Sequence, residues 1–414
     1  MSEPSPARPE RPGDSGVEGG VEGGGVEWSS WSGRIQCRAR EIVRPASEEE
    51  LIEVLRRAVP PVRVVGSGHS FTGLCATSGI LISLDRMQGL VEVDPVRRRA
   101  TVLAGTVLHR LGPLLREQGL AMENLGDIDR QSLAGAIATG THGTGRELGN
   151  LSSQVTGMRL VTASGRVVDL GEDDPRLAAA RVSLGALGIA TRIELRLLEA
   201  YRLHERRSLH PAEEILPRFE QLAREHRHAE IFWTSKRDRC QLKLFDGADE
   251  PADLDRLDQR GREGERIGWS DRVLPSVRET RFHEIELAVA AERGMGLFLE
   301  LRTLMRERYS EVRWPLELRT VAADDAWLSP AHGRATMTVS AHQGADLPYE
   351  AFFADVESIG HNHGARPHWG KVHGYAAGEL AGLYPRFGDF RELRAQLDPE
   401  ERLVNDHLRR VLLG

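Results

Sequence analysis

The sequence predicts an α+β fold in two parts that meet near residue 200. In the first part, short β-branched runs alternate with two amphipathic helical patterns and with glycine-rich turns. From Tyr201 onward the charge density rises, and further helical and strand patterns follow less regularly. A length of 414 residues is enough for two or three domains with buried cores.

The elements of the first part follow from capping signals and strand patterns. Ser47 to Glu50 has the form of a capping box and predicts a helix that ends before Pro60-Pro61. A second helix, with leucines on one face, begins near Leu108 and stops at Gly119. Strands are expected at 62–65, 80–84, 90–93, 100–103, 155–161, 166–170 and 189–197.

The second part contains fewer clear boundaries. Helices are expected at 212–225 and 294–308, and strands at 230–234, 282–288, 316–321 and 335–341. The stretch 246–266 is polar and poor in apolar residues, so it is interpreted as a long loop.

Composition argues against several classes of protein. A net charge of −7 disfavours a nucleic-acid binder, because neutralising phosphates requires a basic surface. No apolar stretch reaches the roughly 18 to 20 residues that span a bilayer, so membrane association is not indicated. The three cysteines form no C-x-x-C pair, which favours a reducing, cytoplasmic setting. Residues 1–27 are rich in Gly, Pro, Glu and Ser and are expected to be a disordered tail.

A glycine loop follows the strand at 62–65. The glycines of Gly66-Ser67-Gly68 permit positive φ and let backbone N–H groups approach an anion, and His69 follows at once. Position 71 is Phe where the dinucleotide fingerprint G-x-G-x-x-G requires its third glycine, so a classical NAD site is disfavoured. Taken alone, the loop is equally consistent with a tight turn.

A second region of small residues runs from Gly126 to Gly145. Between Ser132 and Gly143 it combines Ala, Gly and Thr at a density that would let a helix N-terminus lie against a flat ligand. On physical grounds alone, close helix packing explains it as well.

Taken together, several motifs resemble those of a known family. Val65-Gly-Ser-Gly-His-Ser-Phe-Thr72, the Gly126–Gly145 block and Ser183-Leu-Gly-Ala-Leu-Gly-Ile189 resemble the FAD-linked oxidases of the vanillyl-alcohol oxidase type. Within them, the match is to the aldonolactone and alditol oxidase branch, which Arg366-Pro-His-Trp-Gly-Lys-Val-His373 and the segment 397–407 also resemble. The resemblance covers roughly residues 28 to 414.

The resemblance implies a two-domain architecture. Residues 28–200 would form a PCMH-type FAD-binding domain of two α+β subdomains. Residues 201–414 would form a cap domain of the D-arabinono-1,4-lactone oxidase type, with a large antiparallel sheet flanked by helices, and about 370–414 would return to the FAD domain.

It also implies a set of cofactor contacts. His69 matches the position where many relatives attach the flavin covalently, and the alternative is a histidine that only hydrogen-bonds FAD. Gly126 matches a position where side-chain bulk restricts oxygen, so glycine there favours an oxidase. The implied FAD-binding residues are Val65, Gly66, Ser67, Gly68, His69, Ser70, Gly126, Asp127, Ser132, Gly135, Thr139, Gly140, His142, Gly143, Gly188, Ile189, His368 and Lys371.

The implied substrate residues lie in the second part. Glu317 and Arg319 alternate on one strand and so share a face; in the family the matching pair binds and helps to activate the hydroxyl, and the alternative is a surface ion pair. Lys371, one of only three lysines among 55 basic residues, matches a cation that stabilises the reduced flavin. Alditol oxidases carry a His and a Thr where this chain has Ser340 and His342, so His342 is either a pocket residue or structural.

The resulting hypothesis is an FAD-dependent oxidoreductase. It would oxidise a CH–OH group of a sugar-derived lactone, polyol or sugar by hydride transfer to flavin N5, with O2 reoxidising the flavin to give H2O2. A dehydrogenase with a cytochrome, quinone or dye-like acceptor is the alternative. No metal is expected; a remote rival is a metal-dependent lactone hydrolase built on His361, His363, His368 and His373. A third class is a non-catalytic flavin-binding protein.

Overall fold

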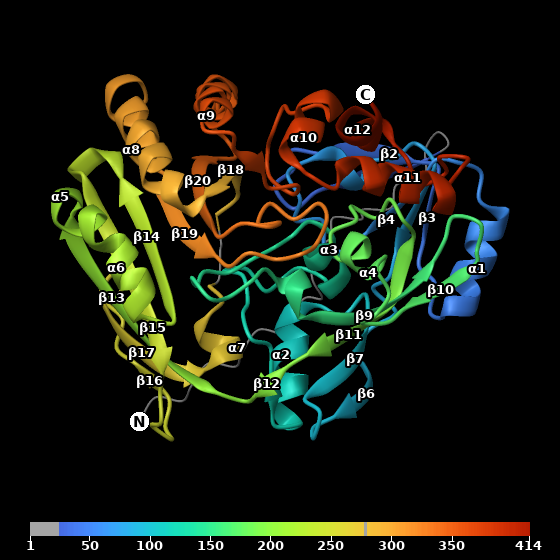
Figure 1. Cartoon of the computed structure of the whole chain (residues 1–414), viewed down its shortest axis with the longest axis horizontal. Helices are drawn as coiled ribbons and strands as arrows, with labels where there is room; N and C mark the ends of the chain where they lie inside the picture. The colour runs from blue at the N-terminus through green and yellow to red at the C-terminus, as the bar shows by residue number, and fades with distance from the viewer. Residues whose placement is uncertain (1–24, 277–279) are drawn as a thin grey trace, which may run out of the picture.

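The computed structural model describes residues 25–276 and 280–414 and divides into an N-terminal part and a large sheet beside it (Figure 1). The expected tail at 1–27 lies outside the described residues except at its end, where Val26 and Glu27 belong to a strand. That strand, β1 (Val26–Ser29), pairs with β2 (Gln36–Ala39) because Trp28 is buried between them and the neighbouring core.

Two sheets form the N-terminal part. A parallel sheet has the order β3 (Glu41–Val43), β5 (Ile80–Ser83) and β4 (Val62–Val65). An antiparallel sheet has the order β10 (Val167–Leu170), β9 (Val155–Val161), β11 (Ile189–Arg196), β7 (Arg99–Leu103) and β6 (Leu90–Asp94). A small pair, β8 (Leu120–Ala121) with β12 (Leu198–Glu199), leads out of this part.

Local signals place the helices of this part. In α1 (Glu48–Arg57), Ser47 accepts a hydrogen bond from the N–H of Glu50, as the capping box predicts. The second helix, α2 (Leu108–Glu117), buries its leucine face, and Gly119 ends it with φ +74°. The short helices α3 (Leu133–Ala138) and α4 (Leu177–Ala180) pack against the antiparallel sheet.

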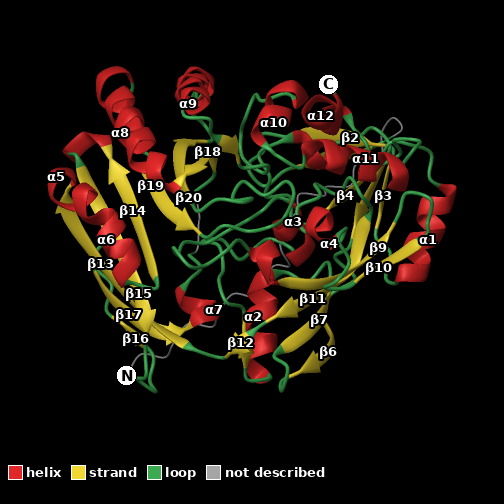
Figure 2. Cartoon of the chain, in the orientation of Figure 1, coloured by secondary structure: helices red, strands yellow, loops and turns green. Residues whose placement is uncertain are grey.

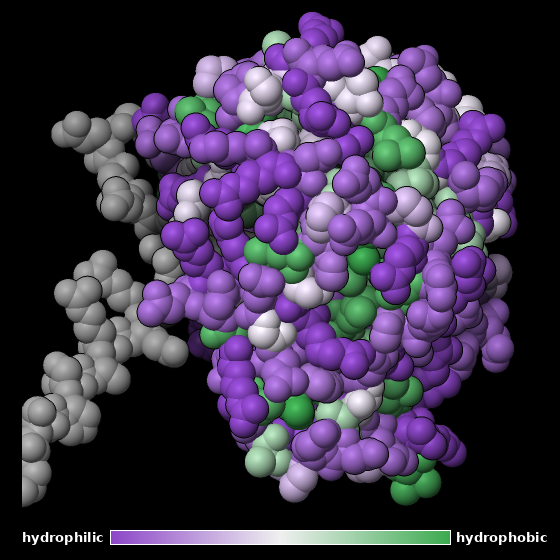
Figure 3. Space-filling view, turned by 90° about the vertical axis from the view of Figure 1, so that its left-hand side faces the viewer, coloured by the Kyte–Doolittle hydropathy of each residue, from purple (hydrophilic) through white to green (hydrophobic). Residues whose placement is uncertain are grey.

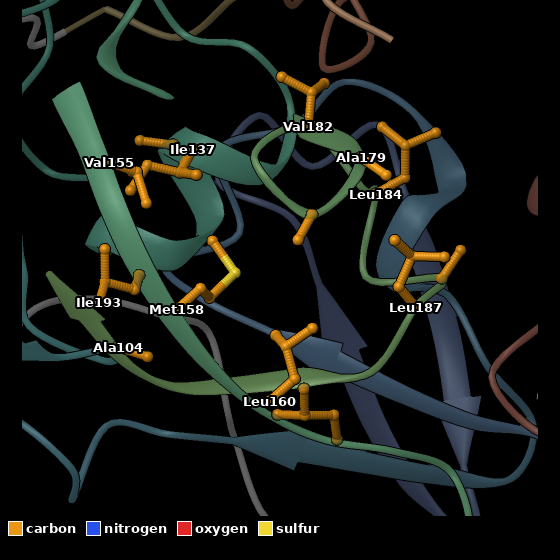
Figure 4. Close-up of a cluster of buried hydrophobic side chains, with 14 of the residues drawn as sticks. Ala104, Ile137, Val155, Met158, Leu160, Ala179, Val182, Leu184, Leu187 and Ile193 are labelled. Carbon is orange, nitrogen blue, oxygen red and sulfur yellow. The ribbon is translucent and has the colours of Figure 1, made fainter. Parts of the chain in front are cut away.

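Figure 4 shows the core beneath these two short helices. Ile137 and Val182 approach from the helix side, and Val155, Met158 and Ile193 from the sheet, and all five are buried. Each such side chain contributes about 1.5 to 3 kcal/mol by leaving water. This packing holds the glycine-rich segment that follows α3 in a fixed position.

The second part is one antiparallel sheet of nine strands, which we call the cap sheet. Its order is β16 (Leu254–Asp255), β17 (Gly264–Trp269), β13 (Arg202–Pro211), β15 (Arg239–Gly247), β14 (His228–Thr234), β19 (Leu316–Val321), β20 (Thr336–Gly344), β18 (Phe282–Ala290) and β21 (Arg366–Pro367). Figure 2 shows helices lying along the side of this sheet that faces away from the N-terminal part. They are α5 (Ala212–Ile215), α6 (Phe219–Glu225), α8 (Ala291–Arg308) and α9 (Glu350–Asn362).

The cap sheet is apolar on its helix-covered face. Alternate residues of the central strands, such as Ile231, Leu287, Leu318 and Val339, form one buried cluster with the helices. The residues between them on the same strands therefore point to the other face, toward the N-terminal part. The loop expected at 246–266 is partly wrong, because β16 and the start of β17 lie within it.

The chain returns to the N-terminal part at its end. Helices α10 (Ala377–Leu383), α11 (Phe387–Leu397) and α12 (Asp406–Leu408) bury apolar residues in the same core as α2 and β11. One more short helix, α7 (Ser270–Val273), packs beside β17.

The outer surface is mostly hydrophilic. On the side over the cap helices, hydrophobic residues are scattered among polar ones (Figure 3), and Leu299 of α8 is an exposed example. Among the described residues, no helix has the length and apolar character needed to cross a bilayer.

Candidate active site

A cavity of about 150 Å³ lies between the polar face of the cap sheet and the loops of the N-terminal part. From the N-terminal side, segments 69–71, 126–131 and 139–142 line it. From the other side come β14, β18, β19 and β20, together with the segment 368–371. Three aromatic side chains also line the cavity, those of Trp31, Phe282 and Trp314. Segments far apart in sequence thus converge on one space.

A chain of contacting ionisable side chains ends at Glu317 in this cavity. A guanidinium nitrogen of Arg319 contacts Glu317, while the Arg319 Nε donates to Glu230 at 2.9 Å. The Lys243 Nζ donates to the other oxygen of Glu230 at 2.8 Å. Burial raises the pKa of Glu317 to about 8 although Arg319 opposes the shift. For Glu230, burial also acts upward, but Lys243 and Arg319 prevail and lower its pKa. Glu317 is therefore the carboxyl that keeps a proton at neutral pH.

A second group connects Glu284 to Lys371 and His342. The Lys371 ammonium contacts Glu284, and the His342 Nε2 lies 3.6 Å from the same carboxylate. His342 also donates from Nδ1 to the Pro315 carbonyl at 3.0 Å. Burial opposes ionisation of Glu284, but Lys371 and His342 lower its pKa. The strand register explains this grouping, because Glu284 and His342 are direct partners across β18 and β20.

A third group joins the two parts of the molecule. The Nδ1 of His142 lies 2.8 Å from the Gly143 carbonyl, and its Nε2 lies 2.7 Å from Glu286. Burial raises the pKa of Glu286, but His142 outweighs it and holds this pKa well below its usual range. His142 thereby connects a loop of the N-terminal part to a strand of the cap sheet. Ser340 donates to the second oxygen of Glu286.

The glycine loop is shaped for an anion. The backbone N–H groups of residues 67–70 have no hydrogen-bond acceptor within the described chain. At Gly66 a Cβ atom would lie 2.1 Å from the Ser132 Oγ, and Gly68 has φ +69°, so both positions require glycine. Unpaired N–H groups on a glycine turn suit a pyrophosphate, and the residues therefore fit FAD.

His69 follows this loop and faces the cavity. Its ring stacks on Trp31 with centroids 5.4 Å apart. Burial, together with the charges of Lys371 and Arg130, lowers the pKa of His69 to about 4. The imidazole is thus neutral at pH 7.

Comparison with known proteins shows two matching families along this chain. Residues 39–171 match the FAD binding domain family, and residues 257–411 match the D-arabinono-1,4-lactone oxidase family. The L-gulono-1,4-lactone dehydrogenase of Mycobacterium tuberculosis is 36% identical, over 93% of this chain and 99% of the relative. An alditol oxidase of a Streptomyces species is 31% identical over 93% and 99%. The chain belongs to the FAD-dependent aldonolactone oxidoreductase family.

Other members of this family and its fold extend the comparison. The L-gulonolactone oxidase of Mus musculus is 28% identical, over 94% of this chain and 98% of the relative. The crystal structure of cholesterol oxidase from B. sterolicum matches with a TM-score of 0.83 at 15% identity, over 99% of this chain and all of that one. The expected vanillyl-alcohol oxidase relationship and the α+β, PCMH-type fold with a large antiparallel sheet are confirmed.

The structure brings together part of the residue set expected for this family. The expected residues that line the cavity are His69, Ser70, Gly126, Asp127, Thr139, His142, Glu317, Arg319, His342, His368 and Lys371. Gly66, Ser132 and Gly135 lie beside one another next to it. Val65 belongs to the small core around Trp28.

The remaining expected residues do not themselves line the cavity. A Cβ at Gly143 would overlap the Leu125 carbonyl, and Gly140, with φ +74°, lies against Pro330 and Val182. Gly188 and Ile189 pack beside Val161 in the antiparallel sheet.

The histidines of the rival metal hypothesis do not come together. His361 pairs with Glu379 and His363 with Glu300, both near the surface. Two other sets of donor atoms in the described chain lie within 4.8 Å: His142, Glu286 and His368, and Glu284, Glu317 and His342. The second set already contacts two cationic side chains, those of Lys371 and Arg319. The positive charge in this cavity is therefore supplied by the protein.

Sequence reasoning missed Glu284, Glu286, Glu230 and Lys243. The signal was present in the strand 282–288, where two glutamates two residues apart alternate with apolar side chains. The two carboxylates lie on one face of the strand, and the opposite face is apolar. Once it is known that helices cover the apolar face, this pattern indicates that the carboxylates line a polar, enclosed surface.

Proposed function

We propose that this family member oxidises a CH–OH group of a sugar-derived lactone or polyol. The observation that carries the proposal is Glu317, a buried carboxyl with a raised pKa beside Arg319, in the same cavity as Lys371 and His69. FAD, when bound, supplies the chemistry by accepting a hydride from the carbinol carbon. The carboxylates of the cavity wall accept hydrogen bonds, which suits a substrate with several hydroxyl groups.

The roles of the chain's own groups follow from their charges. Glu317 accepts the proton of the substrate hydroxyl, and its raised pKa makes it a stronger base than an ordinary carboxylate. Burial would lower the pKa of Arg319, but Glu317 and Glu230 raise it instead, so Arg319 stays cationic and orients the hydroxyl oxygen. Lys371 contacts Glu284. Its positive charge would stabilise negative charge that develops on the flavin ring when FAD is bound. His342, fixed by the Pro315 carbonyl, borders the substrate space.

His69 is proposed as a covalent tether for the flavin. A neutral imidazole has a nitrogen lone pair available for bond formation, and the low pKa of His69 keeps that form dominant. Its position directly after the loop with unpaired N–H groups supports this role.

Two acceptors are considered for the electrons. Gly126 lines the cavity, and a Cβ there would be crowded, at 3.2 Å from the Thr141 Cγ2 and 3.3 Å from the His142 carbonyl oxygen. Glycine at the position where side-chain bulk restricts oxygen in relatives supports O2 as acceptor, with H2O2 as product. The name of the M. tuberculosis relative, a dehydrogenase, supports the alternative of a cytochrome, quinone or dye-like acceptor. A cytoplasmic location is also proposed, because Cys37, Cys75 and Cys240 are all free.

An anaerobic substrate screen tests this function. Purified holoenzyme is mixed with aldonolactones, alditols and aldoses, and loss of flavin absorbance is followed. Bleaching by a lactone or polyol is expected; bleaching by none of them contradicts the proposal. Admitting oxygen or a dye to the reduced enzyme then separates the oxidase from the dehydrogenase, by measuring H2O2 formation against dye reduction.

A further inference from the structure

Lys243 and Glu230 form a buried ion pair directly behind the cavity wall. Their side chains are each 6% exposed, and the Lys243 Nζ also lies 4.4 Å from the centroid of the Phe232 ring. Phe232 lines the cavity, whereas neither member of the pair does. Only three of the 55 basic residues in this chain are lysine, and Lys243 is the one that is buried in the described chain. The partly exposed Lys371 also pairs with a carboxylate of the cap sheet.

The pair is connected to the catalytic groups by strand register. Lys243 and Glu230 are direct partners across β15 and β14, and Arg319 projects from β19, the next strand. Glu230 uses one oxygen for Lys243 and the other for the Arg319 Nε. With its Nε held in this way, the Arg319 guanidinium turns its outer nitrogen toward Glu317. Three charges of alternating sign, followed by the Glu317 carboxyl, thus cross three neighbouring strands.

The balance of charge explains why the pair is needed. Without Lys243, the Glu230 carboxylate would have Arg319 as its single close cation, and this would draw Arg319 away from Glu317. Leaving a buried charge without compensation is strongly unfavourable. Lys243, a compact point charge, neutralises Glu230 and leaves the charge of Arg319 to Glu317.

We propose that Lys243 and Glu230 are positioning residues that hold Arg319 against Glu317 and fix the charge that Glu317 experiences. The inference rests on the proposed roles of Glu317 and Arg319. The charged and titratable groups that face Glu317 are Arg319 on its own strand, Glu230 on β14, His342 on β20, Glu284 on β18 and Asp127 from the N-terminal loop. Glu230 is the member of this set that Lys243 controls.

Glu230→Gln tests the charge with little change of shape. Removing one negative neighbour should move the ionisation of Glu317 to lower pH by about one unit, because the ionised form loses a repulsion. The pH midpoint of anaerobic flavin reduction by substrate should move equally. The matched control is Glu205→Gln, since Glu205 is an equally buried carboxylate of the cap sheet, held by Arg207 and Arg266, that does not line the cavity. An unchanged midpoint in Glu230→Gln, or the same shift in Glu205→Gln, overturns the proposal.

Lys243→Met tests positioning by rescue. Loss of the cation should draw Arg319 toward Glu230 and slow flavin reduction by roughly 10-fold or more, a change of about 1.4 kcal/mol in the barrier. Adding Glu230→Gln to Lys243→Met should restore most of the rate, since the carboxylate that needed compensation is gone. Loss of packing alone predicts no such rescue, so a double variant as slow as Lys243→Met contradicts the inference. Thermal unfolding and the absorbance of bound FAD measure how much of each variant is folded. If Lys243→Met does not fold, the pH midpoint of the isosteric Glu230→Gln variant tests the inference.

A substrate-free measurement separates this inference from the proposed function. Isotope-edited infrared titration of glutamate carboxyls reports ionisation of Glu317 directly, with Glu317→Gln to assign the band. If the band shifts in Glu230→Gln while no lactone or polyol reduces the flavin, the proposed function fails and the inference stands. If substrates reduce the flavin while the band does not shift, the inference fails alone.

Discussion

The raised pKa of Glu317 makes the reaction rate depend on pH in a defined direction. With a pKa of about 8, Glu317 is ~9% ionised at pH 7 and ~91% ionised at pH 9. A base that works only when ionised should therefore give a ~10-fold faster anaerobic flavin reduction at pH 9 than at pH 7. Stopped-flow reduction at saturating substrate measures this rate without the acceptor. The rise should level off above pH 9.

Glu317→Gln is the matched control for this profile. The variant should reduce its flavin slowly, and its rate should lack the rise centred near pH 8. A flat profile in the parent enzyme, or the same rise in Glu317→Gln, would refute Glu317 as the base. Stability supplies an independent check of the sign: the unfolded carboxyl ionises above about 4.5, whereas the folded one keeps its proton until about 8. Parent stability should thus fall over this interval relative to Glu317→Gln.

Three further predictions concern the cofactor, the cation and the core. His69→Ala should release flavin that otherwise remains fluorescent on a denaturing gel; flavin lost equally from the parent contradicts the tether. Lys371→Ala should slow flavin reduction by on the order of 100-fold with FAD still bound, whereas the exposed Lys236→Ala should not change it. Arg63→Met should lower the free energy of unfolding by about 2 to 4 kcal/mol in denaturant titration, because Arg63 donates to buried carbonyls from three chain segments; an unchanged midpoint contradicts this.

Strands with one buried apolar face could be predicted from the sequence, whereas strands rich in charged residues that pair across the sheet could not. The predicted limits of β4, β9 and β19 are confirmed, because apolar side chains mark all three and prolines or glycines flank β4 and β19. By contrast, four of the ten residues of β13 are charged and two more are histidines, and β15 alternates weakly. Their charges pair across strands, as Arg206 does with Asp246, and such pairing cannot be seen before the register is known.

The same holds for the candidate site: some of its residues could be identified from the sequence, and others could not. The resemblance indicated Glu317, Arg319, Lys371 and His69 by position, and the structure brings all four to one cavity. Glu284 and Glu286 were missed because a glutamate on a strand is usually solvated, and only sheet order reveals that these two are enclosed. Their partners come from residues far away in sequence, His142 and Lys371, so no local pattern could have identified the pairs.

The asymmetry of the cap sheet accounts for the polar character of the cavity. Helices α6, α8 and α9 cover one face, which is accordingly apolar, and the other face meets loops of the N-terminal part instead of a second hydrophobic layer. Carboxylates on that face can stay buried only if cations or hydrogen-bonding groups reach them. Arg319 and Lys243 come from the sheet itself, Lys371 comes from the returning C-terminal segment, and the His142 ring of the N-terminal loop contacts Glu286. The contact between His142 and Glu286 bridges the two parts of the molecule. Glu286 therefore keeps this partner only when the cap sheet is correctly docked on the N-terminal part. The same contacts that fix the two parts together therefore also leave Glu317 as the single carboxyl in the chain of ion pairs that holds a proton at neutral pH.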